Sequence, residues 1–204
     1  MTRSLALLEV RGLHRLGLGP VSFDLAPGEC VIVQGPSGAG KSLLLRALAD
    51  LDPNEGKVRL EGTPRATVPA PTWRRQVNYV ASAPGWWGET AGTHFADWPA
   101  AIFTVESLEL PAEYKDWPVA RLSTGERQRL GLAQALLIAP RVFLLDEPTS
   151  DLDADARANV EAAVGARLTS GSAALWVSHD AAQAARLASR ALGVAGGVVT
   201  DAAL

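Results

Sequence analysis

Short apolar runs alternate along the chain with longer segments in which apolar residues recur at helical spacing. The runs predict strands at Leu5–Arg11, Val21–Leu25, Cys30–Gln34, Lys57–Leu60, Val77–Ala81, Val142–Asp146, Ala174–Ser178 and Ala191–Val194. The helical spacing predicts helices at Lys41–Asp50, Gly125–Ile138, Ala154–Leu168 and Ala181–Ala188, and the composition of Pro53–Gly56 predicts a turn. Such alternation is typical of a mostly parallel sheet with helices on both faces.

The segment from Ser82 to Arg121 has a different composition, rich in tryptophan, proline and glycine. It predicts short helices and loops, so that residues of about 82–138 form a small helical subdomain inserted into one domain spanning residues 1–204. Trp86 and Trp87 have two interpretations here. They either form an aromatic docking surface for a partner, or they pack the core of the subdomain itself.

A glycine-rich loop follows the third predicted strand and matches the pattern G-x-x-x-x-G-K-[ST] at every fixed position. Its residues, all expected to contact ATP, are Gly35, Pro36, Ser37, Gly38, Ala39, Gly40, Lys41 and Ser42. The glycines let successive backbone N–H groups turn toward a phosphate, and the following helix adds its positive N-terminal end. Lys41 is expected to reach the β- and γ-phosphates, and the Ser42 hydroxyl to bind Mg²⁺.

Two consecutive acids, Asp146 and Glu147, end the apolar strand that begins at Val142. Open α/β sheets bind their ligands at the carboxyl ends of their strands, which places both acids near the glycine-rich loop. Asp146 is expected to hold Mg²⁺ through water, and Glu147 to orient or deprotonate the attacking water. Together with Lys41, these residues predict ATP hydrolysis.

The segment Leu122–Leu130 resembles the signature sequence of ATP-binding cassette (ABC) proteins, usually Leu-Ser-Gly-Gly-Gln. Ser123 and Gly125 agree with that sequence, whereas Thr124 and Glu126 depart from it. Ser123 would cap a helix whose N-terminal N–H groups can meet a γ-phosphate. By itself the segment is equally an ordinary capping box, since Glu126 stands three residues after Ser123.

The resemblance to ABC ATPases covers essentially the whole chain, with the motifs in the family's order. It implies an α/β fold: a P-loop NTPase core with a mostly parallel sheet, an N-terminal antiparallel β part and the inserted helical subdomain. Asp151 and Asp153 match the loop that contacts a partner cassette, and His179 matches the family's switch histidine near the γ-phosphate. Two cassettes, expected to be two copies of this chain, would pack head to tail around ATP, with residues 123–126 covering the partner's nucleotide.

Two positions depart from the family in ways that bear on the site. Ser82 stands where the family has a glutamine that contacts Mg²⁺, which predicts a water-bridged contact or altered coupling. The family also stacks an aromatic residue on adenine from a loop before the phosphate loop. The short segment 12–20 offers only His14 for that contact.

Composition restricts the partners. A formal net charge of −3 argues against direct nucleic-acid binding, and no segment reaches the roughly 18–20 apolar residues that cross a bilayer. The single Cys30, in an apolar run, is expected to be a buried core residue. The leading interpretation is therefore a cytoplasmic ATPase subunit, peripheral at the membrane, that uses ATP and Mg²⁺ and acts through a separate membrane-spanning transporter subunit. The alternatives are a non-transport cassette ATPase acting on nucleic acid or ribosomes, and a nucleotide-gated binding module with little turnover.

Overall fold

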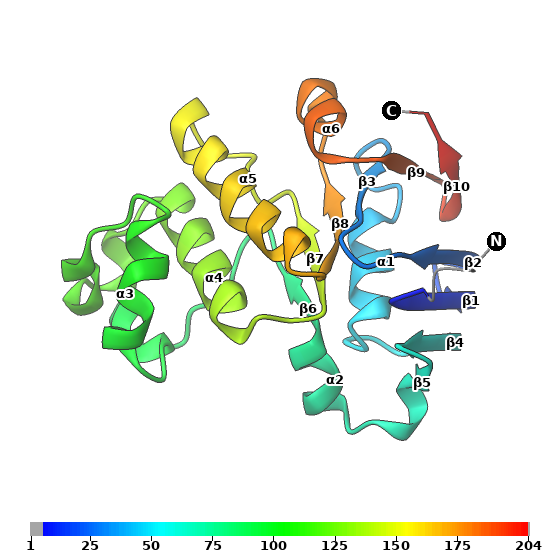
Figure 1. The fold of residues 1–204 in the computed structure, drawn as a ribbon, viewed down its shortest axis with the longest axis horizontal. Coiled ribbons are helices and arrows are strands. Elements are labelled where there is room, and N and C mark those ends of the chain that lie inside the picture. The colour runs from blue at the N-terminus through cyan, green and yellow to red at the C-terminus, as the bar shows by residue number, and fades with distance from the viewer. Residues whose placement is uncertain (1–5, 204) are drawn as a thin grey trace.

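The computed structural model describes residues 6–203 and contains two β-sheets with helices packed around them (Figure 1). The larger sheet has six strands in the order β10-β9-β3-β8-β7-β6. Its members are β3 (Cys30–Gln34), β6 (Val77–Val80), β7 (Val142–Asp146), β8 (Ala173–Val177), β9 (Arg190–Ala195) and β10 (Val198–Ala202). All neighbouring strands run parallel except β10, which pairs antiparallel with β9.

The second sheet is antiparallel, with the order β2-β1-β4-β5. Its strands are β1 (Leu8–Arg15), β2 (Leu18–Leu25), β4 (Glu55–Leu60) and β5 (Thr63–Pro64). Pro20 lies in β2, an edge strand of this sheet, where its missing N–H removes no bond from a second neighbour. The α/β class, with a mostly parallel sheet and an N-terminal antiparallel part, is thus confirmed.

Alternate side chains of the parallel strands point into two separate apolar cores. On β3, Val31 and Val33 join a core shared with helix α1 (Lys41–Leu48) and the antiparallel sheet, whereas Cys30 and Ile32 join a core on the opposite face. Strands covered on both faces read as continuous apolar runs, which is why the sequence predicts the bounds of β3 and β7 correctly. Burial raises the pKa of Cys30 to about 12, so this thiol is a core residue as expected.

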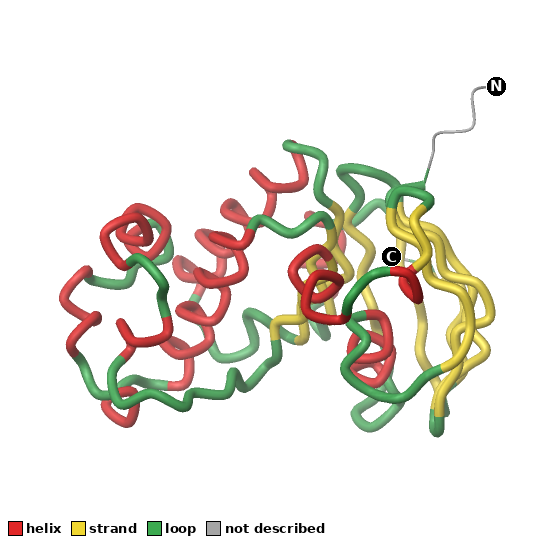
Figure 2. Tube along the Cα trace, turned by 90° about the horizontal axis from the view of Figure 1, so that it is seen from below, coloured by secondary structure: helices red, strands yellow, loops and turns green. Residues whose placement is uncertain are grey.

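Most helices gather at the end of the molecule away from the antiparallel sheet (Figure 2). The second core is covered by α4 (Thr124–Ile138) and α5 (Ala154–Thr169), with α3 (Trp98–Glu106) outside them. The segment between β6 and α4 also contains the 3₁₀ turns η2 (Ala91–His94), η3 (Ala112–Asp116) and η4 (Val119–Arg121). This is the mixture of short helices and loops that its composition predicts. Helix α6 (Ala181–Leu187) follows β8.

Several boundaries differ from the sequence predictions. The apolar pattern does not predict four short elements, because none of them has a sustained apolar period. They are helix α2 (Ala70–Gln76), the turn η1 (Arg65–Thr67) and strands β5 and β10. Strand β4 already begins at Glu55, inside the predicted turn 53–56. Strand β1 continues to Arg15 through a register shift between Arg11 and His14, and the predicted start at Leu5 lies outside the described residues.

Candidate nucleotide-binding site

The phosphate loop, residues 35–42, connects the carboxyl end of β3 to the first turn of α1. Gly40, at the helix N-cap, has a φ of +110°, a conformation that side-chain-bearing residues rarely adopt. Lys41 is only 6% exposed, and its Nζ donates to the carbonyl oxygens of Gly35 and Pro36 at 2.9 and 3.1 Å. The loop therefore encloses an ammonium group at the N-terminal end of a helix, an arrangement suited to an anion.

Asp146 ends β7 and is almost fully buried. Its Oδ2 atom accepts a hydrogen bond of 2.8 Å from the hydroxyl of Tyr79 on the neighbouring strand β6. Burial and the adjacent carboxylate raise the pKa of Tyr79 well above its ordinary value, so the phenol stays protonated and donates at neutral pH. The second carboxylate oxygen, Oδ1, is thereby left for another ligand.

Glu147 directs its carboxylate toward the phosphate loop. It lines the same cavity as Gly38, Lys41 and Ser42, and its Oε1 atom lies 3.0 Å from Nε2 of His179. The main chain at Glu147 has a φ of +51°, which is unusual for a non-glycine residue. This turn separates the directions of Asp146 and Glu147, as two adjacent acids with different tasks require.

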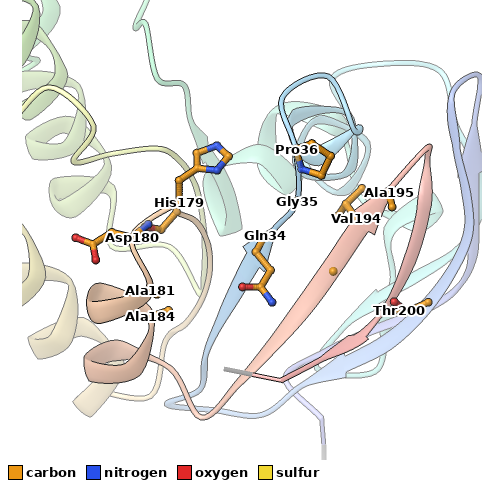
Figure 3. A pocket seen from close by; sticks show the side chains of 12 residues that line it. Gln34, Gly35, Pro36, His179, Asp180, Ala181, Ala184, Val194, Ala195 and Thr200 are labelled. Atoms are coloured by element: carbon orange, nitrogen blue, oxygen red, sulfur yellow. The ribbon is translucent and has the colours of Figure 1, made fainter.

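His179 follows β8 and also borders a larger hollow at the carboxyl ends of the parallel strands. Gln34, Gly35 and Pro36 line that hollow from the side of β3, with His179 facing them from the loop before α6 (Figure 3). Residues from β3, β7 and β8 thus converge at one edge of the sheet. The structure brings together the phosphate loop, both acids and the histidine that the sequence singled out.

The signature segment, residues 122–130, forms a capping box at the start of α4. The Glu126 N–H donates to Ser123 Oγ at 3.2 Å, and the Ser123 N–H donates to Glu126 Oε2 at 2.7 Å. The Tyr114 hydroxyl donates to the other oxygen of Glu126, which raises the pKa of Tyr114 to about 12. Although partial burial opposes it, the bonds from Tyr114 and Ser123 hold the pKa of Glu126 below its ordinary value. Glu126 therefore carries its negative charge within an internal network.

Residues 123–126 lie against the loop after Glu147 and do not line the cavity of the phosphate loop. A Cβ atom on Gly125 would come within 3.0 Å of Leu152 Cδ2 and 3.1 Å of the Asp151 carbonyl oxygen. Asp153 caps α5, since its Oδ1 accepts from the Ala156 N–H at 2.9 Å. Gly125 of the signature segment thus lies directly against the loop that carries Asp151 and Asp153.

Ser82 and His14, the two positions that depart from the sequence pattern of ABC ATPases, lie in different places. Ser82 follows β6 at the inner edge of the helical subdomain, where its carbonyl oxygen is 3.4 Å from Gln128 Nε2. His14 lies on β1, with Nδ1 3.0 Å from the Gly12 carbonyl oxygen and Nε2 3.5 Å from Glu55 on β4. The turn that follows His14 reaches the phosphate loop, because a Cβ on Gly40 would lie 3.5 Å from the Gly17 carbonyl oxygen.

Sequence reasoning missed three polar residues that support the site: Tyr79, Gln128 and Gln183. Gln183, 1% exposed on α6, accepts from Ser178 Oγ at 2.7 Å and donates to Thr149 Oγ1 at 3.0 Å. It therefore joins the residue before His179 to the loop after Glu147. A polar residue on an otherwise apolar helix face was the one available signal, and it does not reveal the partner.

Residues 6–203 contain neither a metal-binding cluster nor a membrane-spanning helix. Between residues 6 and 203, no group of three or more His, Cys, Asp or Glu side chains is placed to hold a metal ion. No helix in that range combines the length and apolar character needed to cross a membrane. Magnesium bound to a nucleotide needs no such cluster, because it takes a few protein oxygens together with water and phosphate oxygens.

Comparison with known proteins agrees with this geometry. The sequence model of the family "ABC transporter" matches residues 18–150. The chain is 36% identical to the probable iron export ATP-binding protein FetA of Escherichia coli, over 80% of this chain and 78% of that protein. It is 38% identical to the aliphatic sulfonates import ATP-binding protein SsuB 3 of Nocardia farcinica, over 98% of this chain and 81% of the relative.

Solved structures show the same fold. The structure of an ATP-binding subunit of an ABC transporter superposes with a TM-score of 0.86 at 25% identity, covering 97% of this chain and 90% of that one. A dimeric ATP-binding cassette bound to ADP and Pi superposes with a TM-score of 0.79 at 21% identity, covering 95% and 98%. Family, relatives and fold agree with the site at the strand ends: the chain belongs to the ABC transporter family as an ATP-binding and ATP-hydrolysing subunit.

Proposed function

We propose that this chain drives transport by closing on a second copy of itself around ATP and by reopening after hydrolysis. The observation that carries the proposal is the division of the site. Lys41, Ser42 and Glu147 line one cavity, whereas the signature residues Ser123 and Gly125 lie on another surface beside Asp151. A signature segment that does not line its own phosphate cavity becomes useful when a second cassette supplies the nucleotide. ATP then shifts the population from open to closed dimers.

Within one site, each residue has a separate task. Backbone N–H groups of residues 35–42 and the Lys41 ammonium bind the phosphates. The Glu147 carboxylate orients the attacking water and accepts its proton, and His179, 3.0 Å away, holds that carboxylate and approaches the γ-phosphate. The Ser42 hydroxyl and the Asp146 carboxylate suit Mg²⁺, a hard cation that neutralises charge on the phosphates when bound. Ser82 acts on the cation through water, and His14 contacts the base.

Replacing Tyr79 by Phe tests whether Asp146 is a ligand of Mg²⁺. The substitution removes one hydroxyl and leaves a nearly buried carboxylate without its donor. We expect the free energy of unfolding to fall by about 1–3 kcal/mol, measured by urea denaturation of the nucleotide-free protein. An unpaired carboxylate is a stronger cation ligand, so adding Mg²⁺ to the ATP-bound variant should recover more stability than it does in the parent.

Tyr114→Phe is the matched control, because it removes the same bond from Glu126, a carboxylate that keeps the Ser123 N–H as a donor. It should lower stability by less and leave the Mg²⁺-dependent gain unchanged. An equal Mg²⁺-dependent gain in Tyr79→Phe and the parent would show that Asp146 does not bind the ion.

The membrane subunit docks, in this proposal, on an apolar depression of the helical subdomain at the cytoplasmic face of the membrane. Trp87, Phe95, Leu137 and Ile138 line it, and Trp87 is 83% exposed. In this proposal Trp86 belongs to the core of the subdomain and Trp87 to the docking surface. Trp86 packs on the core beneath the subdomain, whereas Trp87 is exposed, with its ring centroid 4.5 Å from that of His94 and the two rings steeply inclined.

Capture from native membranes tests this assignment. Tagged Glu147→Gln protein, incubated with Mg-ATP and gently solubilised membranes, should retain a polytopic membrane protein. Adding Trp87→Ala should reduce the retained amount at least about tenfold, since a central exposed tryptophan contributes strongly to an interface. Capture of ribosomes or nucleic acid without any membrane protein would instead favour the non-transport alternative.

Phe103→Ala serves as the control for capture. Phe103 is 84% exposed on α3 of the same subdomain and does not line the depression. It should leave capture intact, and both single variants should keep the thermal stability of the parent. Equal loss in Trp87→Ala and Phe103→Ala would place the membrane partner elsewhere on the subdomain.

A further inference from the structure

Gln128 is a buried amide at the junction of three functional segments. It lies on α4, five residues after the cap Ser123, and is 1% exposed. Its Nε2 atom donates to the Glu147 carbonyl oxygen at 2.7 Å and lies 3.4 Å from the Ser82 carbonyl oxygen. Two carbonyl oxygens beside one terminal atom require the NH₂ group there, which fixes the orientation of the amide.

The bond from Gln128 holds a main chain that needs support. Glu147 adopts a φ of +51°, and residues with a side chain persist in such a conformation only where their surroundings enforce it. Besides Gln128, its carbonyl oxygen accepts from the N–H and Oγ of Ser150 at 3.3 and 3.2 Å. These two donors belong to the same tight turn, so among the three only Gln128 fixes the turn to another part of the fold.

Packing around Gln128 ties it to the segment leaving β6. Gly131, one turn along α4, is so close to Pro84 that a Cβ there would lie 2.8 Å from the proline Cγ. The face of α4 that carries Gln128 therefore rests directly on residues 82–84. Movement of α4 relative to the sheet changes the distance between the Gln128 amide and the Glu147 peptide.

Folding stability alone would not favour a glutamine at position 128. The Oε1 atom of Gln128 is buried and accepts no hydrogen bond from the residues that the structure describes. An orphaned acceptor in an apolar setting destabilises the folded state, and an unbranched apolar side chain of similar length avoids that cost. The unpaired oxygen therefore offsets part of the stability that the donor half of the amide contributes.

We propose that Gln128 is a positioning residue for hydrolysis: it holds the Glu147 peptide so that the carboxylate faces the attacking water only when the signature helix is correctly seated. The proposal rests on the proposed function, because it assigns the water-activating role to Glu147. Since α4 begins with Ser123, closure on a partner's ATP and activation of the chain's own water are coupled through one side chain. Ser82 contributes its carbonyl oxygen to the same contact.

Gln128→Met tests the role, because it keeps length and removes the donor. We expect kcat for ATP to fall about ten- to a hundredfold, as for a small misplacement of a catalytic group, while KM changes less than about twofold. Urea denaturation should show unchanged or higher stability. Gln134→Met is the matched control: Gln134, also on α4, donates to the His94 carbonyl oxygen at 2.9 Å. Its kcat should stay within about twofold of the parent.

The double variant decides whether Gln128 acts through Glu147. In the Glu147→Gln background, the residual single-turnover rate with radiolabelled ATP should not fall further when Gln128→Met is added. If the double variant lost the product of the two single-variant rate reductions, Gln128 would not act through Glu147. That result, or a kcat of Gln128→Met within twofold of the parent, would overturn the positioning role while leaving the proposed function intact. Full hydrolysis by Glu147→Gln alone would overturn both that function's assignment of Glu147 and the role of Gln128.

Discussion

Replacing Glu147 by Gln is expected to lower the steady-state rate of ATP hydrolysis at least about a hundredfold while ATP binding is retained. The amide has the size of the carboxylate, so the cavity shared with Lys41 and Ser42 keeps its shape. It cannot accept a proton from water. Phosphate release measures the first effect and equilibrium binding of a fluorescent ATP analogue the second. In the proposed cycle hydrolysis reopens the cassettes, so the variant should also accumulate as a dimer in Mg-ATP, visible by light scattering.

Glu61→Gln is a suitable control for this substitution. Glu61 has nearly the same main-chain conformation as Glu147, with a φ of +49°, and its carboxylate pairs with Arg141 at the surface. Any effect of placing glutamine in the left-handed region is therefore common to both variants. Glu61→Gln should hydrolyse ATP at the parent's rate. If Glu147→Gln does so too, another group must activate the water.

The sequence predicts best those features that depend on local pattern and position along the chain. Strands β3 and β7 are continuous apolar runs that end on a polar residue, and both have the bounds that the sequence predicts. Their carboxyl ends carry the phosphate loop and the two acids, and parallel strands bring carboxyl ends to one edge. The meeting of Lys41 with Glu147 could therefore be anticipated without a structure.

The apolar pattern along the chain does not predict contacts between segments that are far apart in the sequence. The hydroxyl of Tyr79 meets Asp146 across 67 positions of sequence, and Gln128 meets Glu147 across 19. Nothing in the spacing of these residues specifies which side-chain atoms face each other. The position of His14 depends likewise on the irregular register of β1 against β4, which the residues between them do not encode in an evident period.

A second large effect is expected on stability. Gly35→Ala should lower the free energy of unfolding by about 3–5 kcal/mol, which combines a strained main chain with overpacking. Gly35 has a φ of +148°, and a Cβ there would lie 2.1 Å from the Val194 carbonyl oxygen on β9. Neither the loop nor the buried strand can move without disturbing the sheet. Urea denaturation of the nucleotide-free protein measures the loss, and its melting temperature should fall by about 10 °C.

Gly38→Ala distinguishes main-chain strain from steric overlap with a neighbouring strand. It introduces the same methyl group into the same loop. Gly38 has a φ of +76°, but nothing lies within 4 Å of the position of its Cβ. Only the conformational cost remains, about 1 kcal/mol, so the melting temperature should fall by about 2–4 °C. Equal losses would mean that β9 does not confine the loop. A much larger loss in Gly35→Ala would show that the first glycine is required by the passing strand, independently of any phosphate.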